Sequence, residues 1–206
     1  MAKPFLTDHT KAALTEAVRA VEACSSAELV VAVRPQSGSY LHADLIVGIV
    51  AGLATLAGLL YSRWTFGLAW FLIDPLLAGG LAGLAASRSW AVRRLLTSRQ
   101  ERRRRAETLA RAIFVEKRVH VTSGRTGMLL FVSVLEREAV LVVDAGVEVL
   151  AATDGWKEKA GEIEATVRAG ADAAELATAL QGLAGLLSPA LVRSADDVDE
   201  LPNEVC

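Results

Sequence analysis

The chain has 206 residues, of which 52% are hydrophobic, and its mean hydropathy of +0.36 is high for a protein built only of soluble domains. The formal net charge of −2 hides a strong asymmetry: the segment from Arg88 to Arg118 carries ten Arg and one Lys against three Glu, or +8, so the remainder carries −10. Two cysteines, Cys24 and Cys206, and three scattered histidines fit no metal or redox spacing, which argues against zinc and dithiol chemistry.

Residues 1–40 are predicted to form the first part of a cytoplasmic α/β domain. The N-terminal segment has no apolar core, so we expect no cleavable signal peptide. Apolar residues at helical spacing predict a helix over residues 7–23 with Thr7 as its N-cap, and ELVVAV at residues 28–33 predicts a strand. Because a long apolar segment follows, this strand must pair with a part of the chain beyond residue 118.

Residues 41–88 are predicted to form a transmembrane helical hairpin. Residues 45–62 carry no charge and span about 27 Å as a helix, close to the thickness of the bilayer core. A second apolar stretch, residues 66–87, contains one charge, Asp74. Amphipathic aromatic residues lie near the predicted ends, where membrane interfaces favour them. The alternative is a helical hairpin buried in a soluble protein.

The flanking charges predict the orientation of this hairpin. The connecting loop holds one arginine, Arg63, whereas the segment that follows the second span is rich in arginine. The positive-inside rule therefore places both termini in the cytoplasm and the chain in the cytoplasmic (inner) membrane as a two-pass protein.

Two features of the hairpin suggest specific contacts. Gly48 with Gly52, and Gly79 with Gly83, form GxxxG patterns that allow close helix packing, either within one chain or between chains. Asp74 is an ionisable residue inside a span, which by default is a functional hypothesis. It is also compatible with a position near the headgroups, or with a protonated carboxyl bonded to a carbonyl that Pro75 leaves free.

Residues 89–118 are predicted to form one long basic helix beside the membrane, with an arginine quartet at residues 102–105. Anionic lipid headgroups are the expected partner of the basic residues between Arg88 and Arg118. A solvated stalk with a separate partner is the alternative. No nucleic-acid-binding signature accompanies the basic run, so nucleic acid is not an expected partner.

Residues 119–192 complete the domain, and residues 193–206 form an acidic tail. Apolar runs at residues 127–134 and 139–143 predict a β-hairpin, and amphipathic patterns predict helices over residues 156–169 and 173–187, separated by Gly170. A sheet covered on both faces by helices is the economical arrangement. The predicted fold class is therefore a three-layer α/β sandwich, interrupted after its first strand by the hairpin and the basic helix.

Several pieces of the sequence resemble the TPM domain family, which is named after thylakoid lumen, photosystem-repair and receptor-auxiliary proteins. They are SSAELVVAV at residues 25–33, SGRTGMLLFVSVLEREAVLVVDAGV at 123–147, the helix at Trp156, and ELPNEV at 200–205. The chain is most similar to the bacterial membrane branch, with two transmembrane helices after the first strand and a closing NELPN-like motif, in which Asp199 replaces the first Asn. The resemblance implies a compact α/β sandwich, with acid phosphatase activity or calcium binding in some members and assembly or auxiliary roles in others.

Asp144 is the strongest candidate for a functional residue, because it ends an apolar strand where ligands of α/β sheets collect. Glu28, Asp154 and Glu200 could join it as oxygen ligands of Ca²⁺ or another divalent cation. Arg125 could bind a phosphate or pair with a carboxylate, and Gly146 would permit close backbone approach. The alternative for Asp144 is that it caps the amides of its own turn.

Two further polar groups are expected to have no chemical role: residues 136–138 are predicted to be solvated in a tight turn, and Ser133 to be buried in its strand.

Three functions remain open at this stage. The first is a non-enzymatic membrane-anchored interaction or assembly module, with a membrane-protein partner or a homo-oligomer and possible binding of a divalent cation. The second is a metal-dependent phosphatase of the TPM type. The third is a small oligomeric transporter or channel that uses Asp74.

Overall fold

The computed structural model describes residue 5, residues 7–170, residues 173–193 and residue 201. The chain divides into two compact units. Residues 1–37 and 102–206 form the first, here called the α/β unit, and residues 38–101 form the second, here called the hairpin unit. The fold is thus mixed α/β, with one three-stranded sheet in the order β1-β2-β3 among the described residues.

The sheet joins the two parts of the sequence that the hairpin unit separates. Strand β1 (Glu28–Arg34) runs parallel to β2 (Gly127–Ser133), with Glu28 opposite Gly127. Strand β3 (Glu138–Val143) is antiparallel to β2, with Val143 opposite Met128. The predicted β-hairpin and the predicted pairing of the first strand beyond residue 118 are both confirmed.

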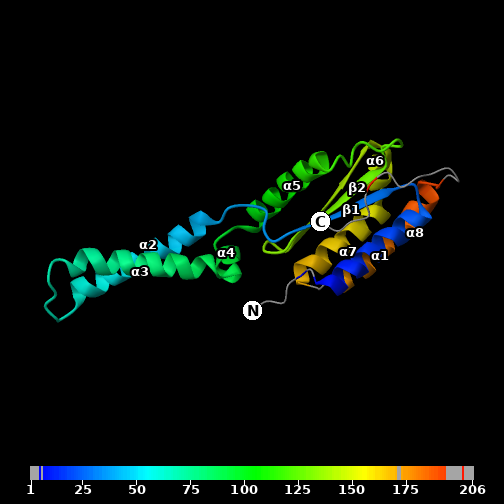
Figure 1. The fold of residues 1–206 in the computed structure, drawn as a ribbon. Coiled ribbons are helices and arrows are strands. Elements are labelled where there is room, and N and C mark those ends of the chain that lie inside the picture. The colour runs from blue at the N-terminus through cyan, green and yellow to red at the C-terminus, as the bar shows by residue number, and fades with distance from the viewer. Residues whose placement is uncertain (1–4, 6, 171–172, 194–200, 202–206) are drawn as a thin grey trace. The chain divides into compact units, whose positions relative to one another are not determined.

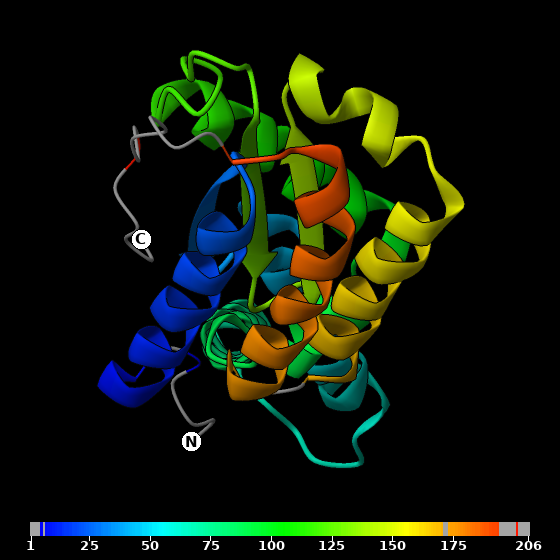
Figure 2. The same cartoon turned by 90° about the vertical axis from the view of Figure 1, so that its right-hand side faces the viewer.

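Helices pack against both faces of this sheet. Three helices, α1 (Asp8–Cys24), α8 (Ala173–Ala190) and α7 (Asp154–Ala169), lie side by side in this order across one face, as Figure 2 shows. Helix α5 (Arg99–Glu116) covers the opposite face with Ala106, Ala110 and Ile113 (Figure 1). The alternation of side chains along each strand produces two separate apolar cores: Leu29 and Met128 belong to the first, Val30 and Leu129 to the second.

Local signals at the helix ends behave as the sequence predicts. Thr7 caps α1 in a reciprocal arrangement with Thr10, and Gly170, at φ +84°, ends α7 in the left-handed conformation. One helix was not predicted: α6 (Ala145–Ala151) begins directly after β3 with Asp144 as its N-cap. Helix α8 contains Pro189 and continues to Ala190, three residues beyond the predicted end at residue 187.

The hairpin unit contains α2 (Leu41–Tyr61), α3 (Trp70–Ser87) and the short helix α4 (Trp90–Leu95). Helices α2 and α3 pack against each other as an antiparallel pair (Figure 1). The connection between them, residues 62–69, is longer than predicted, because the apolar residues from Phe66 onward do not enter α3 before Trp70. Both helices are long and apolar enough to cross a bilayer, and the buried residues in them are Ala43, Asp44 and Ala86.

The prediction of one long basic helix over residues 89–118 is wrong. Helix α4 ends at Leu95, and α5 begins at Arg99. The hydroxyl of Ser98 accepts a hydrogen bond from the amide of Glu101 at 3.3 Å, which is the contact of an N-cap residue. A serine that can cap a new helix therefore interrupts a segment whose other residues favour helix.

Candidate functional site

At the polar site predicted around Asp144, the carboxylate forms an ion pair with Arg125. Asp144 is 5% exposed and lies where β3 ends and α6 begins. The guanidinium of Arg125 donates two hydrogen bonds to it, from Nη2 to Oδ1 at 2.7 Å and from Nε to Oδ2 at 2.9 Å. Oδ1 also accepts the amide of Ala145 at 2.8 Å. The alternative that Asp144 caps its own turn is therefore observed, and Arg125 pairs with a carboxylate.

These contacts set the protonation of the pair. The hydrogen bonds from Arg125 hold the pKa of Asp144 below its usual range, and the amide of Ala145 acts in the same direction. The same interaction raises the pKa of Arg125. Asp144 therefore keeps its negative charge down to low pH, but both of its oxygens already accept hydrogen bonds from the protein.

Gly146 makes the close backbone approach that the sequence predicts, but its partner is the chain's own loop. Its amide donates to the carbonyl oxygen of Arg125 at 2.9 Å. A Cβ atom at this position would lie 2.7 Å from the carbonyl oxygens of both Gly124 and Arg125. The glycine thus allows α6 to pack against the loop that carries Arg125.

The predicted metal ligands are not brought together in the described part of the chain. Glu28, the first residue of β1, and Asp144, directly after β3, lie on opposite sides of Gly127 at the same end of the sheet, so two strand spacings of about 10 Å in total separate their backbones. Asp154 is exposed and pairs with Lys157 at 3.3 Å. Glu200 lies outside the described residues. Among the residues that the structure describes, no group of three or more His, Cys, Asp or Glu side chains could hold a metal ion.

Another part of the chain lies against Gly127, the strand residue between Glu28 and Asp144. A Cβ atom on Gly127 would overlap the carbonyl group of Val119, so the backbone of the loop after α5 lies directly over the first residue of β2. Sequence reasoning missed this contact. The available signal was a glycine inside an apolar strand, which often marks close approach of another backbone.

The opposite end of the sheet contains buried acidic residues that were predicted to be solvated. Glu136 is 1% exposed and Glu138 is 2% exposed. Glu136 accepts hydrogen bonds from the amide of Ser37 at 2.7 Å and from the hydroxyl of Ser133, which is buried as predicted. Glu138 lies 3.8 Å from the guanidinium of Arg103. The prediction of a solvated turn is wrong because these buried carboxylates interact with polar groups next to the hairpin unit in the sequence. Ser37 directly precedes that unit, and Arg103 lies just after it.

Arg103 shows that the arginine quartet is not uniformly solvated. Its guanidinium donates to Glu107 and to Glu164, both at 2.8 Å, and to the carbonyl of Ala139 at 3.2 Å. This arginine therefore joins α5 to β3 and α7. Arg104, one residue further, is exposed.

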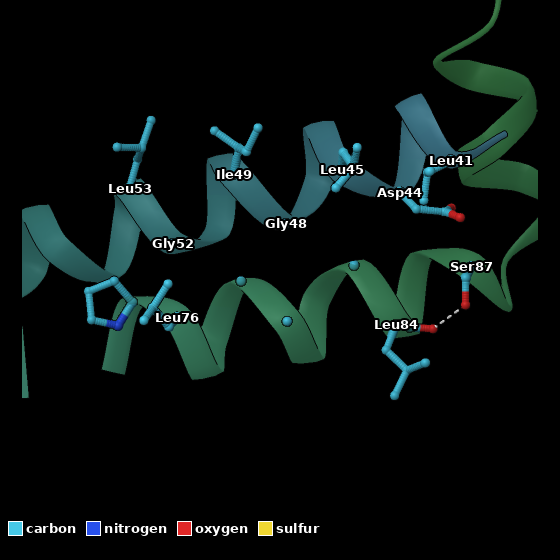
Figure 3. Close-up of a pocket in the computed structure, with 14 residues that line it drawn as sticks. Leu41, Asp44, Leu45, Gly48, Ile49, Gly52, Leu53, Leu76, Leu84 and Ser87 are labelled. Atoms are coloured by element: carbon cyan, nitrogen blue, oxygen red, sulfur yellow. Dashed lines mark hydrogen bonds between the residues drawn. The ribbon is translucent and has the colours of Figure 1, made fainter. Parts of the chain in front are cut away.

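In the hairpin unit, the glycines of both GxxxG patterns face the partner helix of the same chain. Figure 3 shows Gly48 and Gly52 on the side of α2 that faces α3. A Cβ atom on Gly48 would lie 2.8 Å from the carbonyl oxygen of Gly79, and one on Gly52 would lie 2.9 Å from that of Pro75. Helices α2 and α3 thus approach backbone to backbone within one chain, which is the first of the two arrangements that the GxxxG patterns allow.

An open apolar groove of about 640 Å³ runs along this glycine contact. Leu45, Ile49 and Leu53 line it from α2, and Leu76 and Leu84 from α3 (Figure 3). These leucine and isoleucine side chains are more than half exposed. The groove contains almost no polar surface, so it suits an apolar occupant and offers no chemistry of its own.

An ion pair at the base of the hairpin was not predicted. Asp44, in the first turn of α2, accepts hydrogen bonds from Arg93 of α4, from Nη2 at 2.7 Å and from Nε at 3.1 Å. Both side chains are mostly buried, at 11% and 17% exposed. The hydrogen bonds to Asp44 raise the pKa of Arg93. Asp74 makes no such pair with the described residues. It lies near the start of α3, at the end of the hairpin away from Arg93.

No family model and no curated protein matches the chain. Among solved structures, it is similar to the NMR structure of the BA42 protein from the psychrophilic bacterium Bizionia argentinensis. The two share 16% sequence identity with a TM-score of 0.60, over 100% of this chain and 97% of that one. A likeness at this level of identity shows a shared fold and no more.

Proposed function

We propose that the protein is a membrane-anchored interaction or assembly module. In this proposal the hairpin unit crosses the cytoplasmic membrane twice, and the α/β unit, a three-layer sandwich of the TPM type, is held on the cytoplasmic side. Its partner is a membrane protein or a second copy of the chain.

One observation carries the membrane part of the proposal. Helices α2 and α3 bury glycines against each other and leave their leucine and isoleucine side chains exposed, among them Ile49, Leu53 and Leu76 at 60%, 60% and 68%. A hairpin in the core of a soluble protein would have the opposite pattern, with its large apolar side chains covered. Exposed apolar patches of this extent are expected where lipid is the solvent.

The state of Asp144 favours a binding module over a metal-dependent phosphatase. A catalytic metal needs several oxygen ligands with free lone pairs. Asp144 is engaged by Arg125 and by the amide of Ala145, and Asp154 is occupied elsewhere on the surface. The ion pair instead fixes the loop before β2 to the start of α6, which is a structural role.

Cysteine labelling in intact cells tests the topology. Cys24 is exposed on the α/β unit, so it serves as a natural reporter, and Arg63→Cys in the connection between α2 and α3 reports on the other side. In a Cys206→Ser background, a membrane-impermeant maleimide should label Arg63→Cys in intact cells and Cys24 only after lysis. Recovery of the chain in the soluble fraction, or labelling of Cys24 from outside, would contradict the proposal.

A calcium titration of the full chain in detergent tests the choice between module and phosphatase. We expect no calcium-dependent heat and no change in melting temperature for the wild type. Calcium binding that disappears in Asp144→Asn but persists in the matched surface variant Asp154→Asn would establish a carboxylate site at Asp144, contradict its purely structural role and direct attention to phosphatase assays.

A further inference from the structure

We infer that the outer edge of strand β3 is a docking surface for an extended segment of another protein, which adds to the sheet as a fourth strand. This inference rests on the proposed function of an interaction module, and it gives the partner a chemistry. The partner supplies an uncharged strand with apolar side chains at alternate positions, and it binds at Leu141 and Val143.

The hydrogen bonds between β3 and β2 show which backbone groups of β3 point outward. The amide of Asp144, directly after β3, donates to the carbonyl oxygen of Gly127 at 2.9 Å. Bonding residues alternate along an antiparallel ladder, so the even-numbered residues of β3 bond to β2. The odd-numbered residues, Ala139, Leu141 and Val143, therefore direct their amides and carbonyls to the outer edge of the sheet.

One end of this edge is occupied by the chain itself. The carbonyl oxygen of Ala139 accepts a hydrogen bond from Nη1 of Arg103 at 3.2 Å, and Arg103 also donates to Glu164 of α7. Among the residues that the structure describes, none hydrogen-bonds to the outward amides and carbonyls of Leu141 and Val143. Both residues are partly exposed, so these backbone groups lie at the surface.

The opposite edge of the sheet shows how this fold covers a strand. Glu28 bonds to β2, so the next residue of β1, Leu29, directs its amide outward. That amide donates to the carboxylate of Glu22 on α1 at 3.1 Å. The open part of the β3 edge has no such side chain, and residues 139–143 carry no charge. An uncharged edge with unpaired backbone groups is a template for another strand.

The spacing of the layers decides between a single strand and the sheet of a second copy. Three helices, from α1 at β1 to α7 at β3, cover three strands (Figure 2). Helices packed about 8–10 Å apart place the axes of α1 and α7 about 16–20 Å apart, whereas β1 and β3 are only about 10 Å apart. Helix α7 therefore extends beyond β3. Two copies paired through β3 would bring their α7 helices into the same space, but one added strand fits beneath α7.

The side chains beside the open edge set the composition of the added strand. Leu141 and Val143 pack against the first core, on the side of α7, and Val142 packs against the second core. Side chains of the added strand that point to the α7 side become their neighbours, so apolar residues are required at these alternate positions.

Amide hydrogen exchange, followed by NMR on the full chain in detergent micelles, tests this inference. The probe is an eight-residue peptide of alternating valine and threonine with a lysine at each end. Without peptide, we expect slow exchange at Val140 and Val142 and fast exchange at Leu141 and Val143. At about ten times its dissociation constant, the peptide should slow exchange at Leu141 and Val143 about tenfold. The same peptide with its backbone amides N-methylated is the control and should have no effect.

Three outcomes would overturn the inference. They are slow exchange at Leu141 and Val143 without peptide, no slowing by the peptide, and equal slowing by the methylated peptide. Protection that rises with the concentration of the chain alone would show pairing with a second copy, which also overturns it. The experiment does not require the hairpin to cross a bilayer. Its failure therefore overturns the inference alone, and the cysteine labelling described above tests the proposed function separately.

A substitution in β3 tests the hydrogen bonds from the side of the protein. Val143→Pro removes an outward amide and no bond to β2, which edge strands tolerate, and it should weaken peptide binding about fivefold. Val142→Ala, at a residue that bonds to β2, is the matched control and should leave peptide binding unchanged. Slow exchange at Val140 in both variants verifies that the ladder to β2 is intact. Equal affinities for the two variants would contradict docking at this edge; if Val143→Pro disrupts the ladder, the comparison with the methylated peptide decides.

Discussion

The two units of this chain differ in which side chains they bury and which they expose. In the α/β unit, apolar side chains point inward onto a three-stranded sheet, and buried carboxylates such as Asp144 and Glu136 accept hydrogen bonds from the protein. In the hairpin unit, glycines and backbone face inward while apolar side chains point outward. The contrast teaches that exposed apolar side chains are informative about the surroundings of a helix pair only together with the residues that the two helices bury against each other. A helix pair that buries glycine and exposes leucine has the pattern that our proposal of a membrane hairpin requires.

The most damaging substitution we expect is in the α/β unit, at Gly127. Because an added Cβ overlaps the backbone of Val119, Gly127→Ala should lower the free energy of unfolding by about 3 kcal/mol. Gly161→Ala is the matched control, since nothing lies within 4 Å of its added Cβ in helix α7. It should stabilise by about 0.5–1 kcal/mol through helix propensity. Denaturant unfolding of the full chain in detergent measures both, followed by tryptophan fluorescence in a background where Trp64, Trp70 and Trp90 are replaced by Phe, so that buried Trp156 reports alone. Equal effects would contradict the close approach.

The hairpin unit offers the corresponding test at neighbouring glycines of one helix. Gly79→Ala places a Cβ 2.8 Å from the carbonyl oxygen of Gly48 and should destabilise the α2–α3 pair by about 2 kcal/mol. Gly80→Ala, whose added Cβ meets nothing within 4 Å, should cause no loss. Titration with sodium dodecyl sulfate in mixed micelles, followed by circular dichroism, compares the two. If both variants lose stability equally, the glycines do not form the helix contact.

The ion pair at the base of the hairpin should have a smaller effect. Both side chains are mostly buried, so Asp44→Asn or Arg93→Gln alone should cost about 1–2 kcal/mol, with a coupling energy of about 1 kcal/mol in the double-mutant cycle. Asp74→Asn is the control carboxylate, because Asp74 makes no such pair with the described residues, and it should leave the titration curve unchanged. Additive effects of the two single variants would show that the pair does not hold α4 to α2.

Sequence reasoning succeeded where the cause is local or topological. Thr7 and Gly170 end their helices through their own side chain or backbone, and the pairing of β1 with β2 follows because a strand of this kind needs a neighbour. It failed at one local signal, Ser98, whose hydroxyl accepts the amide of Glu101 and begins a new helix inside a run of helix-favouring residues. It also failed where the cause is a contact between distant residues, since the buried Glu136 accepts the amide of Ser37 from far away in the sequence.

The candidate site divides in the same way. The position of Asp144 at a strand exit could be predicted from the apolar run before it, and so could the need for glycine at residue 146. The partner of Asp144 could not be chosen, because sequence gives no distance between Arg125 and any of four carboxylates. The placement of Glu28 across Gly127 depends on strand register, which hydrophobic patterns alone leave open.

The smallest expected effect distinguishes the two roles of Asp144. Asp144→Ala removes both the cap of α6 and the ion pair and should cost about 1.5 kcal/mol. Asp144→Asn keeps a capping oxygen and should cost about 0.5 kcal/mol, because the guanidinium of Arg125 is 61% exposed and water screens the pair. Thermal unfolding of the full chain in detergent, compared at equal pH, measures these differences.

The pH dependence follows from the lowered pKa of Asp144 in the folded state. The stability that the carboxylate contributes is fully present above its unfolded pKa of about 3.9 and is lost as the pH falls through the lower folded value. The wild type should therefore exceed Asp144→Asn by a constant margin from about pH 7 to about pH 5, and the margin should shrink as the pH falls below the unfolded pKa and through the lower folded one. A margin that persists at low pH would mean that the carboxylate acts through hydrogen-bond geometry rather than charge. In that case the buried carboxylate would stabilise the α/β unit through its hydrogen bonds alone, and its negative charge would make no separate contribution.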